Sequence, residues 1–216
     1  MYQGVHNVDA SPDTPDVPRR LPRGTHGLDP SLVAASQRTR LLEAAGRAVA
    51  EKGYAAATIE DIVRGAGVSK KTFYEHFPDK LACFLAAYEA ASDELFEHVR
   101  EAQDAAEPGR ARTQAGIRAY LRWLAAEPAL ARVFLIEIAA AGPKALECRE
   151  RLRDRYAERM RELRGRNEVP EEIFHAVVAA ADDLVVRRLR AGEDVRELEP
   201  VLLELQLALL RDPVSD

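Results

Sequence analysis

Cysteine and aromatic residues are scarce in this chain of 216 residues. The two cysteines, Cys83 and Cys148, are too few for a disulfide framework, and we interpret both as buried thiols of a reducing compartment. A redox-sensing thiol is the alternative interpretation. Aromatic residues make up 6% of the chain, so aliphatic side chains and alanine should fill most of the core.

Several motifs of catalysis and membrane insertion are also missing. There is no glycine-rich phosphate loop, no nucleophile elbow and no His-Glu-x-x-His motif, so the sequence predicts neither an enzyme nor a cofactor. No uninterrupted apolar run approaches the roughly 20 residues that a membrane helix needs. The start of the chain lacks a basic stretch followed by an apolar run, so we expect no signal peptide and a cytoplasmic location.

Alternation of polar and apolar positions, which would indicate strands, is absent too, whereas alanine, leucine, arginine and glutamate are abundant and favour helices. The pattern predicts an all-α protein of about nine helices, separated by glycine and proline. These helices are expected at about 32–52, 59–66, 70–77, 79–105, 112–126, 129–141, 144–166, 170–190 and 198–211. Pro78 fits the first turn of the fourth helix.

The first 31 residues form a segment rich in proline, aspartate and glycine, without apolar periodicity, so we expect residues 1–31 to be a disordered extension. Arg19, Arg20 and Arg23 lie near its end. They belong either to a solvated linker or to a flexible arm that contacts DNA beside a recognition helix.

The stretch from Thr58 to Leu81 has the pattern of two short helices joined by a tight turn. Gly67 can adopt the left-handed conformation that ends the first helix, and Ser69 can cap the second. Phe73 and Phe77 are four residues apart on the second helix and point toward the first.

The remaining faces of this second helix carry basic, hydroxyl and aromatic side chains. A helix of this kind fits the major groove of DNA, where its N-terminal end can reach base edges. The candidate DNA contacts are Thr58, Ser69, Lys70, Lys71, Thr72, Tyr74, His76 and Lys80. Thr58 and Ser69 also have a purely structural interpretation as helix caps.

The charge distribution agrees with a local DNA-binding surface, although the net charge is −5. Residues 19–80 carry eleven bases and seven acids, whereas residues 81–216 carry twenty bases and twenty-six acids. Phosphate binding depends on the local surface, because salt screens distant charges within about 8 Å.

These residues resemble the TetR-type transcriptional regulators. The resemblance covers about Gln37 to Leu81 and includes the segments RTRLLEAAGRAVAEKGYAAATIEDI and AGVSKKTFYEHF, followed by Lys80. Two positions depart from the family pattern, since Val63 replaces a usual alanine and Lys71 a frequent glycine.

The resemblance implies a homodimeric regulator of transcription that binds a palindromic operator in double-stranded DNA. The protein would act as a repressor that a small-molecule ligand releases from the operator. Residues 32–80 would then form the helix-turn-helix DNA-binding domain, and residues 81–216 the ligand-binding and dimerisation domain. The alternative is a helical small-molecule binding protein, or an enzyme, with a vestigial head.

The resemblance also implies a ligand pocket among the C-terminal helices, whose occupancy moves the helix that begins near Pro78. The candidate lining residues are Tyr88, Tyr120, Trp123, Phe134, Glu137 and Met160. Each has an ordinary core position as its alternative, and Glu137 could simply meet solvent or an arginine. His175, Asp182 and Asp183 are poorly spaced for metal ligands, so no metal site is predicted.

The last two predicted helices have apolar surfaces wider than one chain would cover, which indicates a dimer interface. The candidate interface residues are Phe174, Val178, Ala181, Val185, Leu202, Leu205 and Leu209. The alternative is that these two helices only close the core of one chain.

Overall fold

The computed structural model describes residues 29–164 and 169–209. Within these ranges the fold contains nine α-helices, two short 3-10 helices and no strand, so the all-α prediction is confirmed. Most of the predicted N-terminal extension, with Arg19, Arg20 and Arg23, lies outside the described residues. Its last residues are helical, because Asp29 caps a helix that begins at Pro30.

The helices follow one another with short connections. Their bounds are α1 (Pro30–Lys52), α2 (Ile59–Ala66), α3 (Lys70–His76), α4 (Lys80–Asp104), α5 (Arg110–Ala126), α6 (Pro128–Leu135), η1 (Glu137–Ala141), α7 (Pro143–Arg164), α8 (Glu171–Ala191), η2 (Val195–Leu198) and α9 (Glu199–Leu209). None of these helices is long and apolar enough to cross a membrane.

Two details of the predicted helices are wrong. Pro78 precedes α4 instead of lying in its first turn, because the Asp79 side chain caps the helix and accepts a hydrogen bond from the amide of Ala82 at 2.7 Å. The predicted helix 129–141 is divided at Ile136, where φ is −117° and ψ is −57°. The tighter turn η1 that follows places Glu137 against the end of α1.

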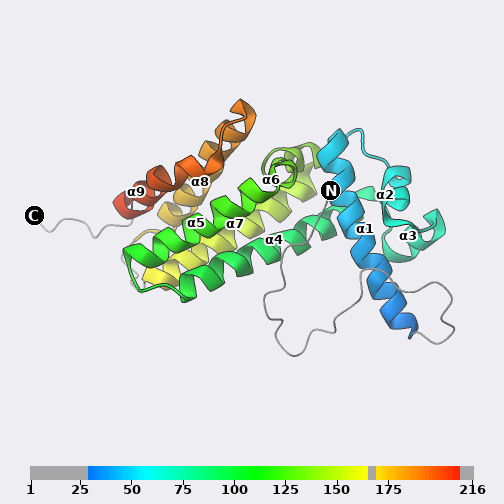
Figure 1. The fold of residues 1–216 in the computed structure, drawn as a ribbon, viewed down its shortest axis with the longest axis horizontal. Coiled ribbons are helices and arrows are strands. Elements are labelled where there is room, and N and C mark those ends of the chain that lie inside the picture. The colour runs from blue at the N-terminus through cyan, green and yellow to red at the C-terminus, as the bar shows by residue number, and fades with distance from the viewer. Residues whose placement is uncertain (1–28, 165–168, 210–216) are drawn as a thin grey trace, which may run out of the picture.

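The elements are arranged as an end unit and an elongated body. Figure 1 shows α1, α2 and α3 together at one end, α4 running from that end into the body, and α8 and α9 along the outer side. α4 packs along α5 and also contacts α1 and α7. One continuous buried cluster includes Leu41 and Phe73 of the end unit and Phe134 and Ile138 of the body. The end unit and the body therefore share a core.

The loop after α1 is the main polar joint between the end unit and the body. The amide of Tyr54 donates a hydrogen bond to Oε2 of Glu137 at 3.1 Å. The ammonium of Lys80 donates to the carbonyl oxygens of Tyr54 and Ala57, both at 2.8 Å, and lies 4.3 Å from the centre of the Tyr54 ring. The Tyr54 ring in turn packs 5.0 Å from that of Phe84. Contacts from α4 and η1 thus converge on Tyr54, in the loop that follows α1.

We predict that Glu137→Ala destabilises the protein by about 1–3 kcal/mol, because the partly buried amide of Tyr54 loses its acceptor. Equilibrium urea unfolding measures this change. Glu94→Ala is the matched control, since Glu94 is an exposed glutamate on α4, and it should change the free energy of unfolding by less than about 0.5 kcal/mol. Equal losses in the two variants would contradict the role of the joint.

The two cysteines are buried and free, as expected from the sequence. Burial raises the pKa of the Cys83 thiol to about 12 and that of Cys148 to about 11. The Cys148 thiol also donates to a carboxylate oxygen of Glu89 at 3.4 Å. Reactive cysteines have lowered pKa values, so the redox-sensing alternative has no support in this geometry.

We therefore predict that iodoacetamide labels the native protein at pH 7 roughly a hundredfold more slowly than the chain unfolded in urea, because the thiolate is the reacting species. Mass spectrometry of timed samples measures both rates. Rapid modification of either cysteine in the native state would contradict this expectation.

Candidate nucleic-acid interface and cavity

Helix α3 is fixed on one side by two buried phenylalanines. Phe73 has no exposed surface and Phe77 is 4% exposed, with their ring centroids 5.9 Å apart. Ser69 caps the helix, and its Oγ accepts a hydrogen bond from the amide of Thr72 at 3.0 Å. A helix of seven residues is marginal on its own, so these contacts determine both its stability and its orientation.

The opposite face of α3 carries Lys71 and Tyr74 into solvent. The side chain of Lys71 is 88% exposed and Tyr74 is 51% exposed. The rings of Tyr74 and Phe73 pack in a T-shaped arrangement with their centroids 5.4 Å apart. This contact positions the Tyr74 ring and leaves it accessible. Lys71 is 3.9 Å from Glu75, and an exposed pair of this kind contributes little. Both side chains are available to an external partner.

The turn before α3 is set by α2. Thr58 and Asp61 form a reciprocal cap, in which the Thr58 hydroxyl accepts from the amide of Asp61 at 3.2 Å and donates to its carboxylate at 2.8 Å. Hydrogen bonds from Lys52 and then Thr58 lower the pKa of Asp61 to about 2. Gly67 follows α2 with φ of 64°, a left-handed conformation that glycine adopts without strain. α2 therefore ends where the sequence predicts.

The other predicted DNA contacts have partners within the chain. Lys70 pairs with Glu60 of α2, and Nε2 of His76 lies 3.3 Å from Oε1 of Gln37. The hydroxyls of Ser69 and Thr72 are 2.9 Å apart. Of these residues, Lys70 and Ser69 remain exposed at the surface of the end unit.

Lys80 differs from the prediction in its placement. Its partly buried ammonium is directed at the carbonyls of the α1–α2 loop instead of projecting outward. Hydrogen bonds from a charged donor are stronger than those between neutral groups, so the two carbonyl oxygens hold the ammonium at the joint. Lys80 is accordingly a positioning residue of the joint and not a free cation.

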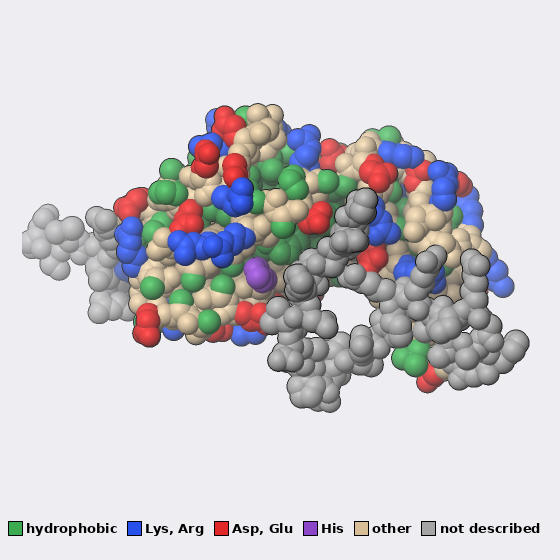
Figure 2. All heavy atoms as spheres, in the orientation of Figure 1, with side chains coloured by type: hydrophobic (Ala, Val, Ile, Leu, Met, Phe, Trp, Pro, Cys, Tyr) green, Lys and Arg blue, Asp and Glu red, His purple; other side chains and the backbone are tan. Residues whose placement is uncertain are grey.

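Sequence reasoning missed three arginines around α3. Arg64 of α2 has a side chain 76% exposed, and Arg38 of α1 lies 4.8 Å from the centre of the Phe77 ring. Arg40 donates to the carbonyl of Ala66, at the end of α2, at 2.9 Å. Figure 2 shows Lys and Arg side chains gathered along the outer edge of the end formed by α1–α3. The excess of bases in residues 19–80 is the signal that could have identified them.

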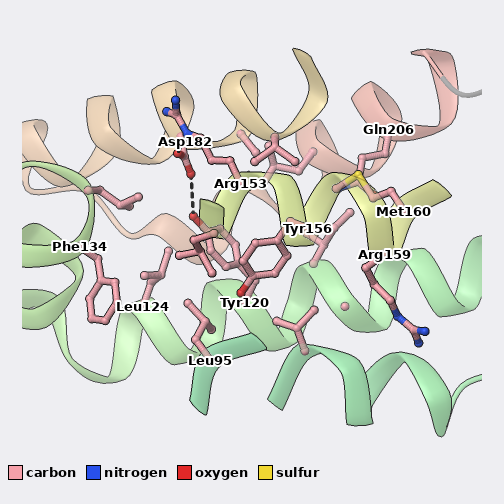
Figure 3. A pocket seen from close by; sticks show the side chains of 18 of the residues that line it. Leu95, Tyr120, Leu124, Phe134, Arg153, Tyr156, Arg159, Met160, Asp182 and Gln206 are labelled. Carbon is pink, nitrogen blue, oxygen red and sulfur yellow. Dashed lines mark hydrogen bonds and ion pairs between the residues drawn. The ribbon is translucent and has the colours of Figure 1, made fainter. Parts of the chain in front are cut away.

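A second candidate site is a cavity of about 90 Å³ inside the body, lined from α4, α5, α6, α7, α8 and α9. One water molecule needs about 10–15 Å³ of such space, so the cavity has room for more than isolated waters. Tyr88, Tyr120, Phe134 and Met160 line it, and Figure 3 shows Tyr120 and Phe134 toward one end and Met160 toward the other.

Two predicted lining residues do not reach the cavity. Trp123 lies behind the wall, packed edge-on against Phe134 at 5.4 Å between ring centroids. Glu137 is directed away, because its carboxylate accepts the hydrogen bond of the Tyr54 amide at the joint. The most polar residue of its apolar segment therefore serves the connection to α1 and is not part of the cavity wall.

The carboxylate that does line the cavity is that of Asp182, which sequence reasoning considered only as a metal ligand. It is 9% exposed. Its carboxylate accepts from Nη2 of Arg149 at 3.1 Å, from Nε of Arg153 at 2.9 Å and, weakly, from the Tyr120 hydroxyl at 3.5 Å. The described residues hold no cluster suited to a metal ion.

Comparison with known proteins identifies the end unit. The model for bacterial regulatory proteins of the tetR family matches residues 41–87, from α1 into α4. The repressor AcnR of Corynebacterium diphtheriae is 29% identical over 174 residues, which cover 77% of this chain and 87% of AcnR. The end unit of this chain therefore matches the TetR family of regulators.

Two further proteins are similar to this chain, one over about half of its sequence and one in its fold. The transcriptional activator FasR of Mycolicibacterium smegmatis is 33% identical over 105 residues, so the alignment spans only about half of each protein, 49% of this chain and 48% of FasR. The structure of the fatty acid degradation regulator FadR from Bacillus halodurans has a TM-score of 0.72 at 19% identity, covering 82% of this chain and 97% of FadR. At that identity the likeness shows the shared fold alone.

The predicted dimer residues of this chain are largely internal. Phe174, Val178, Val185 and Leu202 are each at most 7% exposed within one chain, so these four side chains pack in its core. Ala181 and Leu205 are partly exposed. The side chain of Leu209 lies outside the described part.

Proposed function

We propose that the protein is a TetR-type transcriptional regulator that binds a palindromic operator as a homodimer in the cytoplasm. The observation that carries this proposal is the geometry of α3, whose buried face of Phe73 and Phe77 directs Lys71 and Tyr74 outward at a basic end. Lysine meets phosphate or guanine, and tyrosine can hydrogen-bond a base edge or a phosphate.

We further propose repression relieved by a small molecule held in the cavity. α4 begins in the end unit and contributes Tyr88, Leu95 and Gln103 to the cavity wall. A ligand that fits one position of α4 better than another would shift the equilibrium between two arrangements of the DNA-binding ends. AcnR, which aligns with most of this chain, is a repressor, and this supports the proposed sign of regulation.

The proposed dimer uses the outer faces of α8 and α9. Apolar side chains there are at least partly exposed and recur at helical spacing: Ala176, Ala179 and Ala180 on α8, and Val201, Leu205 and Ala208 on α9. Val201 is 51% exposed, one of the largest exposed apolar side chains in the described ranges. Two end units joined in this way would read half-sites separated by about 34–36 Å, or a multiple of that distance.

We predict that Lys71→Ala weakens binding to an operator fragment, selected by the wild-type protein from random duplexes, at every salt concentration. The slope of log K against log salt should decrease in magnitude by about 1, because one phosphate contact is lost. Fluorescence anisotropy at several salt concentrations measures the slope. Lys144→Ala is the control, an exposed lysine at the start of α7. Unchanged binding by the Lys71 variant, or an equal loss in the control, would contradict the proposal.

We predict that Val201→Glu converts a dimer to a monomer at micromolar concentration, since burying an unpaired carboxylate at an interface costs several kcal/mol. Sedimentation velocity measures the mass. Leu146→Glu, at an apolar side chain 42% exposed on α7, is the control and should leave the dimer intact. A wild-type monomer, or a dimer that persists in the Val201 variant, would refute the proposed interface.

A further inference from the structure

The cavity wall contains more hydrogen-bond donors than acceptors at one end. Arg149 and Arg153 of α7 share the single carboxylate of Asp182 there. Arg153 also contacts Glu150 at 2.9 Å, but the Glu150 side chain is 58% exposed, so water and salt screen its charge. The interior of this end therefore has an excess of positive charge.

Two donors of the cavity wall lack partners. Nε of Arg149 and the hydroxyl of Tyr156 are buried without a hydrogen-bond partner among the described residues. A buried donor without a partner is unfavourable. Burial also raises the pKa values of Tyr88, Tyr120 and Tyr156, so all three hydroxyls stay protonated and can donate. A ligand that brings acceptor oxygens would relieve this excess of donors.

The rest of the cavity is elongated and apolar. Its lining along α7 extends from Arg149 to Met160, about 16 Å at the helical rise of 1.5 Å per residue. Leu95, Val99, Ile117, Leu152 and Leu202 contribute aliphatic walls. In Figure 3 Asp182 and Arg153 lie toward one end of this space, and Met160, Arg159 and Gln206 lie toward the other.

The guanidinium at the far end of the cavity differs in its partners. Arg159 lies there, with Nε donating to Gln103 at 3.1 Å, one terminal nitrogen paired with Asp104 and the other 3.5 Å from Glu162. Each of its three nitrogens thus has an acceptor, whereas Nε of Arg149 has none among the described residues. An anion is therefore favoured at the Arg149 end and an alkyl chain in the space beyond it.

We propose that the effector is an unbranched aliphatic carboxylate, whose carboxylate competes with Asp182 for Arg149 and Arg153. This inference rests on the effector role proposed above. Asp182 is on α8 and both arginines are on α7, so the ligand carboxylate replaces the ion pairs that join these two helices. The hydrocarbon chain lies along the aliphatic walls and displaces water from them.

The test compares decanoate with 1-decanol, which has the same chain and no charge, at concentrations below micelle formation. Trp123 is the single tryptophan of the chain and packs against the lining residue Phe134, so its fluorescence reports occupancy. We expect the wild-type protein to bind decanoate about tenfold or more tightly than decanol, the effect of a charged hydrogen bond in a buried site.

Two variants test the guanidinium pair in opposite directions. Arg149→Gln should weaken decanoate binding about tenfold without changing decanol binding, whereas Asp182→Asn should strengthen decanoate binding, because the competing charge is removed. Arg151→Gln is the control, since Arg151 lies on the same helix, is 62% exposed and pairs with Glu89. Circular dichroism confirms that each variant is folded.

Equal affinities for decanoate and decanol, no binding of either, or weaker decanoate binding by Asp182→Asn would overturn the inference. Operator binding is measured on the same samples. If operator binding persists while the preference for decanoate is absent, only the ligand class is wrong. If operator binding is absent in the wild-type protein, the proposed function itself is wrong.

Discussion

The burial of Phe73 and Phe77 is the constraint on which the proposed interface depends. A seven-residue helix is only marginally stable on its own. The two rings fix it against the core that is shared with α1, α2 and α4. Because the rings occupy one face, Lys71 and Tyr74 must occupy the other. The same burial that stabilises the end unit therefore selects the side chains that a DNA duplex would meet.

The joint at Tyr54 extends this constraint into the body. The ring of Phe134, which lines the cavity, packs 4.9 Å from that of Tyr88 on α4. Glu137, two residues after the end of α6, accepts the hydrogen bond of the Tyr54 amide, and Lys80 at the start of α4 donates to the Tyr54 carbonyl. These contacts join α4 and the segment after α6 to the loop between α1 and α2. Under the proposed function, a bound molecule that displaces α4 or α6 alters the same contacts.

Local signals in the sequence predicted the end unit well. Thr58 and Ser69 cap their helices, Gly67 ends α2 with a left-handed backbone, and the spacing of the phenylalanines fixes the buried face. Each of these signals acts within one or two turns of helix, where sequence neighbours are also spatial neighbours. Lys80 was the exception, because its partners Tyr54 and Ala57 are more than twenty positions away.

The body could be predicted only in outline. Apolar periodicity located its helices, but the same periodicity is expected whether a face packs within the chain or against a second copy, so Phe174, Val185 and Leu202 were assigned to the wrong surface. The partner of Glu137 is likewise remote in sequence, at Tyr54. The role of Asp182 depends on two arginines of α7. Such contacts arise from the packing of helices, which local patterns do not encode.

The most direct measurement is a hydroxyl-radical footprint of the wild-type protein on its selected operator, because it reads the geometry of both ends at once. The account predicts two protected regions related by a two-fold axis, with centres separated by about 34–36 Å or a near multiple, in the register of two α3 helices in successive major grooves. A single protected region, or protection without symmetry, would contradict the account.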